Sequence, residues 1–130
     1  MPKKPSRKTI VKKLDTVFSQ FIRRRFAVNE IAKCVTCGTK SHYKKLQAGH
    51  FMSRKHYSTR WHETNVQVQC YSCNVMRYGE QYKYGLYLED AYGKGTAEQL
   101  QQKSREITKY SDNQLIDMIN YYNELLTNLK

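Results

Sequence analysis

The sequence predicts an α+β fold, in which a zinc-stapled β-hairpin carries one helix before it and further helices after it. Two Cys-x2-Cys pairs, which begin at Cys34 and at Cys70, indicate a shared metal site. Two segments between the pairs alternate apolar and polar residues, as half-buried strands do. Segments before and after them repeat apolar residues every three or four positions, which is typical of amphipathic helices. At 130 residues, the chain has the size of one domain with a helical extension.

The cysteine pairs are Cys34 with Cys37 and Cys70 with Cys73. Four thiolates can surround one Zn²⁺ tetrahedrally, and the short spacer within each pair lets one turn supply two ligands. Such a zinc is structural, because four cysteines leave no open coordination position. Disulfides or free thiols are the alternatives, and an intracellular location favours metal binding.

Positive charge is concentrated in the N-terminal half. The net charge is +12; the segment from Met1 to Arg60 carries 16 Lys and Arg against 2 acids, and the rest of the chain carries 7 against 9. This asymmetry predicts a polyanionic partner, for which DNA is the natural candidate. No apolar run approaches the ~20 residues of a membrane span, and the basic N-terminus does not resemble a signal peptide. We therefore expect an intracellular protein that does not bind membranes.

The N-terminal part divides into a tail and a helix. We expect residues 1–10 to be a disordered basic tail and residues 11–95 to form the main domain. One face of a helix of about four turns is marked by apolar residues at helical spacing: Leu14, Val17, Phe18, Phe21 and Ile22. Arg23, Arg24 and Arg25 follow at its end, where they can complement the helix dipole, contact the DNA backbone, or do both.

The central part predicts the hairpin. Leu46, Ala48 and His50 share one face of a first strand, and a second strand runs from Asn65 to Cys70. A basic loop over residues 53–64 connects them. A helix is expected to start at the second cysteine pair, to contain Asn74, and to stop near Gly79.

Sequence patterns in the C-terminal part predict further helices. Tyrosines at 82, 84, 87 and 92 indicate amphipathic packing or, alternatively, stacking on bases. Two capping-box signatures, Thr96 with Gln99 and Ser111 with Gln114, predict helices near 97–109 and 112–129. We expect these to form a helical hairpin over residues 96–130. A heptad-like seam in the last helix can fold back on the N-terminal helix or act as a dimerisation arm: Leu115, Ile119, Tyr122, Leu126 and Leu129.

Three polar residues suggest phosphodiester hydrolysis. A neutral imidazole can take the proton of an attacking water, which makes His50 the expected general base. Asn74 offers a carbonyl oxygen to a divalent cation, for which Mg²⁺ is expected and Mn²⁺ is the alternative. Asn65 is expected to tie the loop to the strand and so to orient the imidazole. This hypothesis requires His50 and Asn74 to face each other across a gap that fits a hydrated cation and a phosphate.

The spacing of these residues resembles the zinc-containing HNH (ββα-metal) nucleases. The matching pattern is His50, Asn65 and Asn74, with the last of them directly after the second cysteine pair. More narrowly, residues 12–80 resemble the lambdoid-phage NinG (Rap) recombination family, through these segments: 14–19, 22–25, 34–38, 49–51, 53–54, 59–62 and 70–73. The Cys-x2-Cys-Asn ending is also similar to phage endonuclease VII. The resemblance implies a phage recombination endonuclease, active in the host cytoplasm on Holliday junctions and D-loops.

The pattern departs from these relatives at two positions. Asn74 stands where many HNH enzymes have His, and Gly49 stands where many have a metal-binding Asp. We expect a second metal ligand from His62, with His56, Glu63 and Glu80 as alternatives. An inactive site is the remaining possibility.

Six cations are expected to contact DNA phosphates: Arg23, Arg24, Arg25, Arg54, Lys55 and Arg60. A resolvase makes two symmetric incisions, so we also expect a homodimer. Two other functions fit the same residues. One is a homing or nonspecific HNH nuclease, and the other is a zinc-ribbon DNA-binding module without catalysis.

Overall fold

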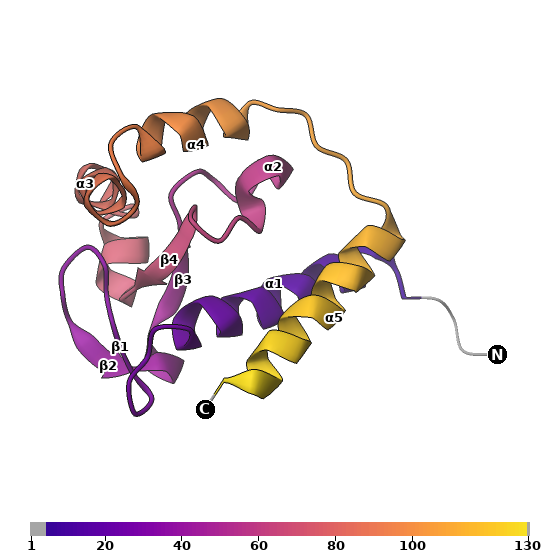
Figure 1. Ribbon diagram of the computed structural model, residues 1–130, viewed down its shortest axis with the longest axis horizontal. Helices are drawn as coiled ribbons and strands as arrows, with labels where there is room; N and C mark the ends of the chain where they lie inside the picture. The colour runs from indigo at the N-terminus through magenta and orange to yellow at the C-terminus, as the bar shows by residue number, and fades with distance from the viewer. Residues whose placement is uncertain (1–4, 130) are drawn as a thin grey trace.

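The computed structural model describes residues 5–129 of the chain. Helices and two small antiparallel sheets alternate along it, as the predicted α+β class requires (Figure 1). The elements are α1 (Arg7–Arg24), β1 (Ile31–Lys33), β2 (Lys40–His42), η1 (Tyr43–Lys45), β3 (Gln47–His50), α2 (Tyr57–Arg60), β4 (Val66–Gln69), η2 (Ser72–Met76), α3 (Gln81–Tyr92), α4 (Thr96–Ser104) and α5 (Asp112–Asn128).

Helix α1 begins earlier than the sequence pattern indicates. Ser6 caps it, because its hydroxyl accepts a hydrogen bond from the Thr9 backbone amide at 3.2 Å. The expected disordered tail over residues 1–10 is therefore wrong for residues 7–10, and residues 1–4 lie outside the described part of the chain. The apolar face is as predicted and extends by one turn to Ile10, which is buried.

Strands β1 and β2 form a small hairpin around the first cysteine pair, which the sequence pattern does not indicate. Ile31 pairs with His42 and Lys33 with Lys40. Each strand has only three residues, too few for a recognisable alternation. Gly38, at a φ of +81°, makes the turn that leads back into β2.

The predicted hairpin between the cysteine pairs is confirmed. β3 and β4 are antiparallel, with Gln47 opposite Gln69 and His50 opposite Val66. Ala48, Val66 and Val68 face α1 and belong to the main apolar cluster. The other face is also covered, since Gln67 and Gln69 have almost no exposed surface. The hairpin is thus the middle layer between α1 and the segment formed by η2 and α3.

The short helix expected to start at the second cysteine pair and to stop near Gly79 is present as a single π-helical turn, η2, which contains Asn74. It ends at a sharp bend in which Tyr78, Gly79 and Glu80 all have positive φ. The tyrosine-rich segment then forms α3. Tyr84 is fully buried, while Tyr82 is mostly exposed, so packing accounts for only part of the tyrosines.

Helix α4 is capped differently from the prediction. Gly95 is its N-cap residue, and the Glu89 carboxylate accepts hydrogen bonds from the backbone amides of Gly95 and Ala97. A carboxylate from the preceding helix thus replaces the expected capping box of Thr96 and Gln99. The helix also ends at Ser104 and not near residue 109. At α5 the capping box of Ser111 and Gln114 is confirmed.

The C-terminal helices do not form the expected hairpin. α4 packs on α2 and α3, whereas α5 lies along α1, and an extended segment connects them (Figure 1). Tyr122 of α5 packs edge-on against Phe18 of α1 with ring centroids 4.9 Å apart, and Leu115 is completely buried. The heptad-like seam therefore folds back within the chain. Its buried residues cannot serve as a dimerisation arm.

A search of the helices within residues 5–129 finds none that combines the length and the apolar character needed to cross a membrane.

The packing of α5 on α1 predicts a large stability effect at Leu115. Leu115→Ala should lower the free energy of unfolding by about 2–5 kcal/mol, because it leaves a cavity in a fully buried contact. Urea denaturation of the zinc-loaded chain measures this. Asn120→Ala, on the exposed side of the same helix, is the matched control and should change the free energy by less than about 0.5 kcal/mol. Equal effects of the two variants would contradict the described position of α5.

Candidate functional site

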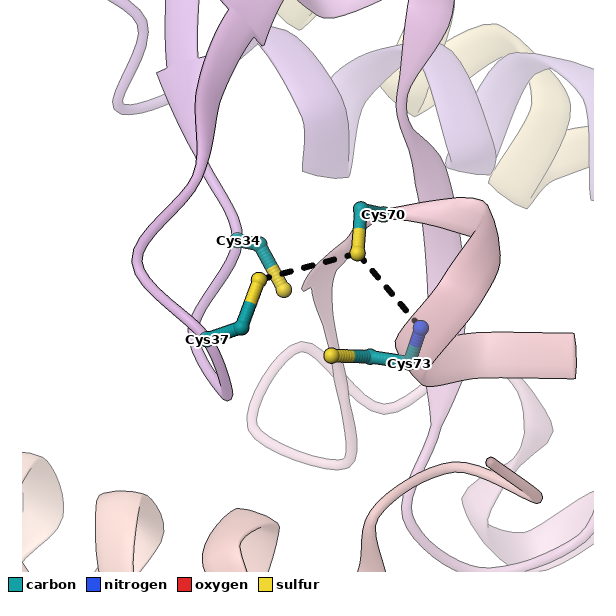
Figure 2. Close-up of side chains that lie close together, drawn as sticks. All are labelled: Cys34, Cys37, Cys70 and Cys73. Atoms are coloured by element: carbon teal, nitrogen blue, oxygen red, sulfur yellow. Dashed lines mark hydrogen bonds between the residues drawn. The ribbon is translucent and has the colours of Figure 1, made fainter. Parts of the chain in front are cut away.

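The four cysteines come together at one point, as the sequence predicts. Their sulfur atoms all lie within 4.8 Å of one another, and the Cys37 and Cys70 sulfurs are 3.7 Å apart. Tetrahedral zinc with Zn–S bonds of about 2.3 Å places sulfurs about 3.8 Å apart. Figure 2 shows the side chains converging from the turn after β1, which carries Cys34 and Cys37, and from the start of the helical turn η2, with Cys70 just before it and Cys73 within it. The cluster fits one structural zinc, held by thiolates alone.

Local backbone geometry prepares each pair. Cys34 directly follows β1, and its carbonyl accepts a hydrogen bond from the Gly38 amide at 2.9 Å, which closes the first turn. Cys70 directly follows β4, and its sulfur accepts the Cys73 amide at 3.4 Å. The Val35 amide also donates to the Val68 carbonyl, so the first turn is attached to β4. The zinc site therefore joins the β1–β2 hairpin to the end of β4.

His50 lies at the end of β3, with one ring nitrogen fixed. Its Nε2 is 3.0 Å from the backbone carbonyl of Arg60, which can only accept, so Nε2 carries the hydrogen. Nδ1 is then the nitrogen with a lone pair, and within residues 5–129 it has no hydrogen-bond partner. Burial, assisted by the nearby charge of Arg54, lowers the pKa of His50 to about 4. The ring is neutral at pH 7, as a general base must be.

A small pocket of about 140 Å³ lies beside His50, between β3, α1 and the loop after β3. The residues that line it are Asp15, Phe18, Ser19, Ala48, His50 and Arg54. The imidazole therefore faces the α1 side of the hairpin.

Asn65 makes the hydrogen bonds expected of it. Its amide nitrogen donates to the carbonyls of Met52 and Thr59, and its oxygen accepts the Met52 amide at 2.8 Å. The side chain is fully buried. It therefore joins both ends of the loop that contains Arg54 and supports the carbonyl of Arg60 against His50.

Asn74 lies on the other side of the hairpin, close to Gly49. Its amide nitrogen donates to Gln47 Oε1 at 2.8 Å, which leaves Oδ1 available. A Cβ on Gly49 would be 3.1 Å from Asn74 Oδ1 and only 1.9 Å from Gln69 Oε1. Gln69 Oε1 is buried and has no hydrogen-bond partner among residues 5–129. Two amide oxygens thus converge on the space beside Gly49, a donor set that suits a hard divalent cation such as Mg²⁺.

The expected direct opposition of His50 and Asn74 is not found. Successive residues of a strand point to opposite faces. Gln47 and Gly49, which contact Asn74, therefore lie opposite Ala48 and His50, which face α1. The side chains of His50 and Asn74 lie on opposite sides of the end of β3 and do not face each other across an open gap. A phosphate would have to lie across the strand end to meet both.

His62 is unsuited to the second-ligand position. Its Nδ1 accepts a hydrogen bond from the Thr64 amide at 3.2 Å, so that lone pair is already in use. Burial and the charge of Lys103 lower the pKa of His62, which indicates contact with α4 and not with Asn74. Of the alternatives, Glu63 accepts a hydrogen bond from Tyr122 of α5, and Glu80 pairs with Lys83 of α3. Among residues 5–129, only the cysteines form a cluster of three or more His, Cys, Asp or Glu ligands.

Three of the six expected DNA contacts are structural. Arg23 donates to the carbonyls of Ser19 and Tyr43. Arg25 donates to the carbonyls of Glu63 and Val66 and to Gln67 Oε1. Arg60 binds Asp15 through two nitrogens, and its side chain is only 13% exposed. These three guanidiniums are bonded to groups within the fold.

The other three cations remain accessible to differing degrees. Arg54 is 62% exposed and touches Asp15 at 3.2 Å, and Lys55 next to it is exposed. Arg24 is half-buried and lies over the ring of Tyr43, 5.4 Å from its centroid. Arg54 lines the pocket beside His50 and is the best placed of the six to meet a phosphate there.

Asp15 is the important residue that the sequence pattern missed. It accepts hydrogen bonds from Arg54, Arg60 and Trp61, so one carboxylate of α1 holds the loop that follows β3. Burial alone would raise the pKa of Asp15, but the bonds and charges of these partners outweigh it and lower the pKa. The sequence contains a signal that could have identified Asp15, because Asp15 and Glu30 are the only acidic residues in the strongly basic segment from Met1 to Arg60.

The cysteine cluster predicts that zinc is required for folding. The purified chain should contain one zinc, and Cys70→Ser should unfold it, because structural zinc contributes on the order of 10 kcal/mol to small domains. Elemental analysis and circular dichroism measure these. Ser72→Ala, an exposed position in the same turn, should retain both zinc and fold. A fully folded chain without metal would contradict the assignment.

The surroundings of His50 predict an unusual titration. Its pKa of about 4 lies below the ordinary value of 6.5, so the folded state resists protonation. Stability contributed by the neutral ring is complete above pH 6.5 and decreases as the pH falls towards 4. In ¹⁵N NMR spectra at pH 5.5, His50 should still be the neutral Nε2–H form. A protonated ring at that pH would contradict the described hydrogen bond and burial.

Comparison with models of protein families finds a match that covers nearly the whole chain. The family model described as NinG, "Bacteriophage Lambda NinG protein", matches residues 2–130. Neither the curated proteins nor the solved structures contain a match to the chain. Because the family model covers nearly the whole sequence, including the cysteine pairs, the chain belongs to the NinG family of phage recombination proteins.

Proposed function

We propose that the protein is a metal-dependent DNA endonuclease of phage recombination that hydrolyses phosphodiesters in branched DNA such as Holliday junctions and D-loops. Membership of the NinG family supports the role in recombination. The order β3, β4, η2, with cysteines at both ends, is compatible with a zinc-stapled ββα-metal core. The host-cell cytoplasm would be the place of action.

The observation that carries this proposal is the state of His50. Its Nε2–H is bound by a backbone carbonyl, its ring is neutral at pH 7, and His50 lines a pocket together with Arg54. A neutral ring with one nitrogen held by a carbonyl can accept a proton at the other nitrogen, which supports the role of a general base. Asn65 maintains it by holding the loop whose carbonyl orients the ring.

In the proposed reaction, separate residues of the chain accept the proton, position the phosphate and bind the metal. Nδ1 of His50 accepts the proton of the attacking water, and Arg60 O keeps the imidazole in the required tautomer. Arg54 positions the phosphate from the exposed side of the pocket. Asn74, with its nitrogen held by Gln47, would bind the divalent metal through Oδ1. When bound, Mg²⁺ or Mn²⁺ supplies Lewis-acid stabilisation of the developing negative charge.

Cleavage of both strands at a junction would require two copies of the chain. The buried face of α5 is excluded as the contact between them, because it already packs on α1. A homodimer would therefore use another surface.

A second candidate is a zinc-stapled DNA-binding module without catalysis. The observation that favours it is the position of His50 and Asn74 on opposite sides of β3. In this case His50 would only close the pocket next to α1, and its replacement would not affect any reaction.

Junction cleavage separates the two candidates. His50→Ala should reduce Mg²⁺-dependent cleavage of a labelled four-way junction by at least ~100-fold, the usual contribution of a general base. Binding to the junction in EDTA should be unchanged. His42→Ala is the matched control, since His42 pairs with Glu30 on the distant β1–β2 hairpin and should leave cleavage intact. Full cleavage by His50→Ala would remove the assigned base, and no cleavage by the wild type would favour the binding module.

A further inference from the structure

The space beside Gly49 is shaped by the side chain of Gln69. A Cβ at position 49 would lie 1.9 Å from Gln69 Oε1 and 2.7 Å from its Cδ, distances that no real pair of atoms tolerates. Gly49 does not have a positive φ, so the backbone does not require glycine there. The position is glycine because the carboxamide of Gln69 occupies the volume that any side chain would need.

The orientation of the Gln69 amide is determined by its partners. Nε2 donates to the Gly79 carbonyl at 2.9 Å and to the Thr36 hydroxyl at 3.2 Å. Since a carbonyl only accepts, the nitrogen must be on that side, and Oε1 must face Gly49. There Oε1 has no hydrogen-bond partner within the described part of the chain, although the residue is completely buried. An unsatisfied buried acceptor is costly, and a bound cation would satisfy it.

A second oxygen points to the same place. Asn74 Oδ1 is 3.1 Å from the position of the missing Cβ, and its own nitrogen is occupied by Gln47. The two oxygens therefore lie close to one point from two different elements. Two carbonyl dipoles that meet without a donor between them repel each other. A hard cation relieves this repulsion and uses oxygens of this kind as ligands.

We propose that Gln69, through Oε1, is the second protein ligand of the divalent metal that Asn74 binds. The proposal rests on the proposed function, which assigns that metal, and it adds the residue that completes the site. Both ligands would be neutral, so the metal keeps its full charge for the DNA phosphate. Gln69 is also bonded to Thr36, between Cys34 and Cys37, which connects the zinc site to the second metal site.

The test is metal binding by the zinc-loaded full chain, without DNA, measured by EPR of added Mn²⁺ in competition with Mg²⁺. The wild type should bind one Mn²⁺ per chain. Gln69→Met keeps the volume but removes the oxygen, and should weaken Mn²⁺ binding at least 10-fold. Gln67→Met is the matched control: Gln67 is equally buried two residues earlier, but it bonds to Thr64, Tyr92 and Arg25. It should leave Mn²⁺ binding unchanged.

A double substitution tests the same metal site by moving the oxygen ligand from position 69 to position 49. Gly49→Asp alone should disturb the site, because its Cβ collides with Gln69. Gly49→Asp combined with Gln69→Ser provides the room and returns an oxygen ligand from position 49, so Mn²⁺ binding should recover to within ~3-fold of the wild type. Because this variant does not depend on Gln69→Met being folded, it decides the question if that variant is unstable. Thermal unfolding and zinc content verify the fold of each protein.

The outcomes separate this proposal from the proposed function. Wild-type affinity in folded Gln69→Met, or a double variant that is folded but does not bind Mn²⁺, would overturn the role of Gln69 and leave the nuclease intact. Junction cleavage with Mn²⁺ that is as fast in Gln69→Met as in the wild type would do the same. A wild type that binds no Mn²⁺ beyond zinc would overturn both proposals.

Discussion

The geometry of this protein depends on the convergence of four sulfur atoms from two distant turns. One pair closes the β1–β2 hairpin, and the other ends β4 and opens η2. Without a bond between them, such short strands would have too few contacts to remain in register. A zinc ion held by the four sulfurs would supply that bond and would fix the direction in which η2 leaves the hairpin. Asn74, directly after Cys73, would then be positioned by metal coordination.

A second constraint holds the other side of the hairpin. Asp15 of α1 accepts hydrogen bonds from Arg54, Arg60 and Trp61 of the loop after β3. Asn65 donates a hydrogen bond to the Thr59 carbonyl of the same segment. The carbonyl of Arg60 then meets His50 in a defined orientation. Tyr84 of α3 donates from the opposite face to the carbonyl of Gly49 at 2.7 Å, and its pKa is raised by burial. The end of β3 is thus fixed from both faces, which is a requirement for any preorganised site.

The sequence predicted what depends on spacing and periodicity. Short sequence patterns were enough to predict four features: the cysteine cluster, the apolar face of α1, the β3–β4 hairpin and the Ser111 cap. The sequence did not predict the side-chain interactions that join residues far apart in the chain. Arg23, Arg25 and Arg60 look like phosphate contacts because of their charge, and only the fold shows that carbonyls and Asp15 occupy them. Gln67 and Gln69 have the polar character of a solvent-facing row, yet α3 and η2 bury them. The face on which Asn74 lies could not be predicted either, because a π-helical turn has no distinctive pattern.

The central claim is that a zinc staple positions a divalent-metal site beside an oriented imidazole at the end of β3. The most direct measurement is a crystal structure of the zinc-loaded chain with Mn²⁺ and an uncleavable four-way junction, with anomalous data at both metal edges. We expect a zinc peak among the four sulfurs and a manganese peak bonded to Asn74 Oδ1, with a phosphate between that metal and His50 Nδ1. Manganese elsewhere, or DNA bound away from the end of β3, would contradict it.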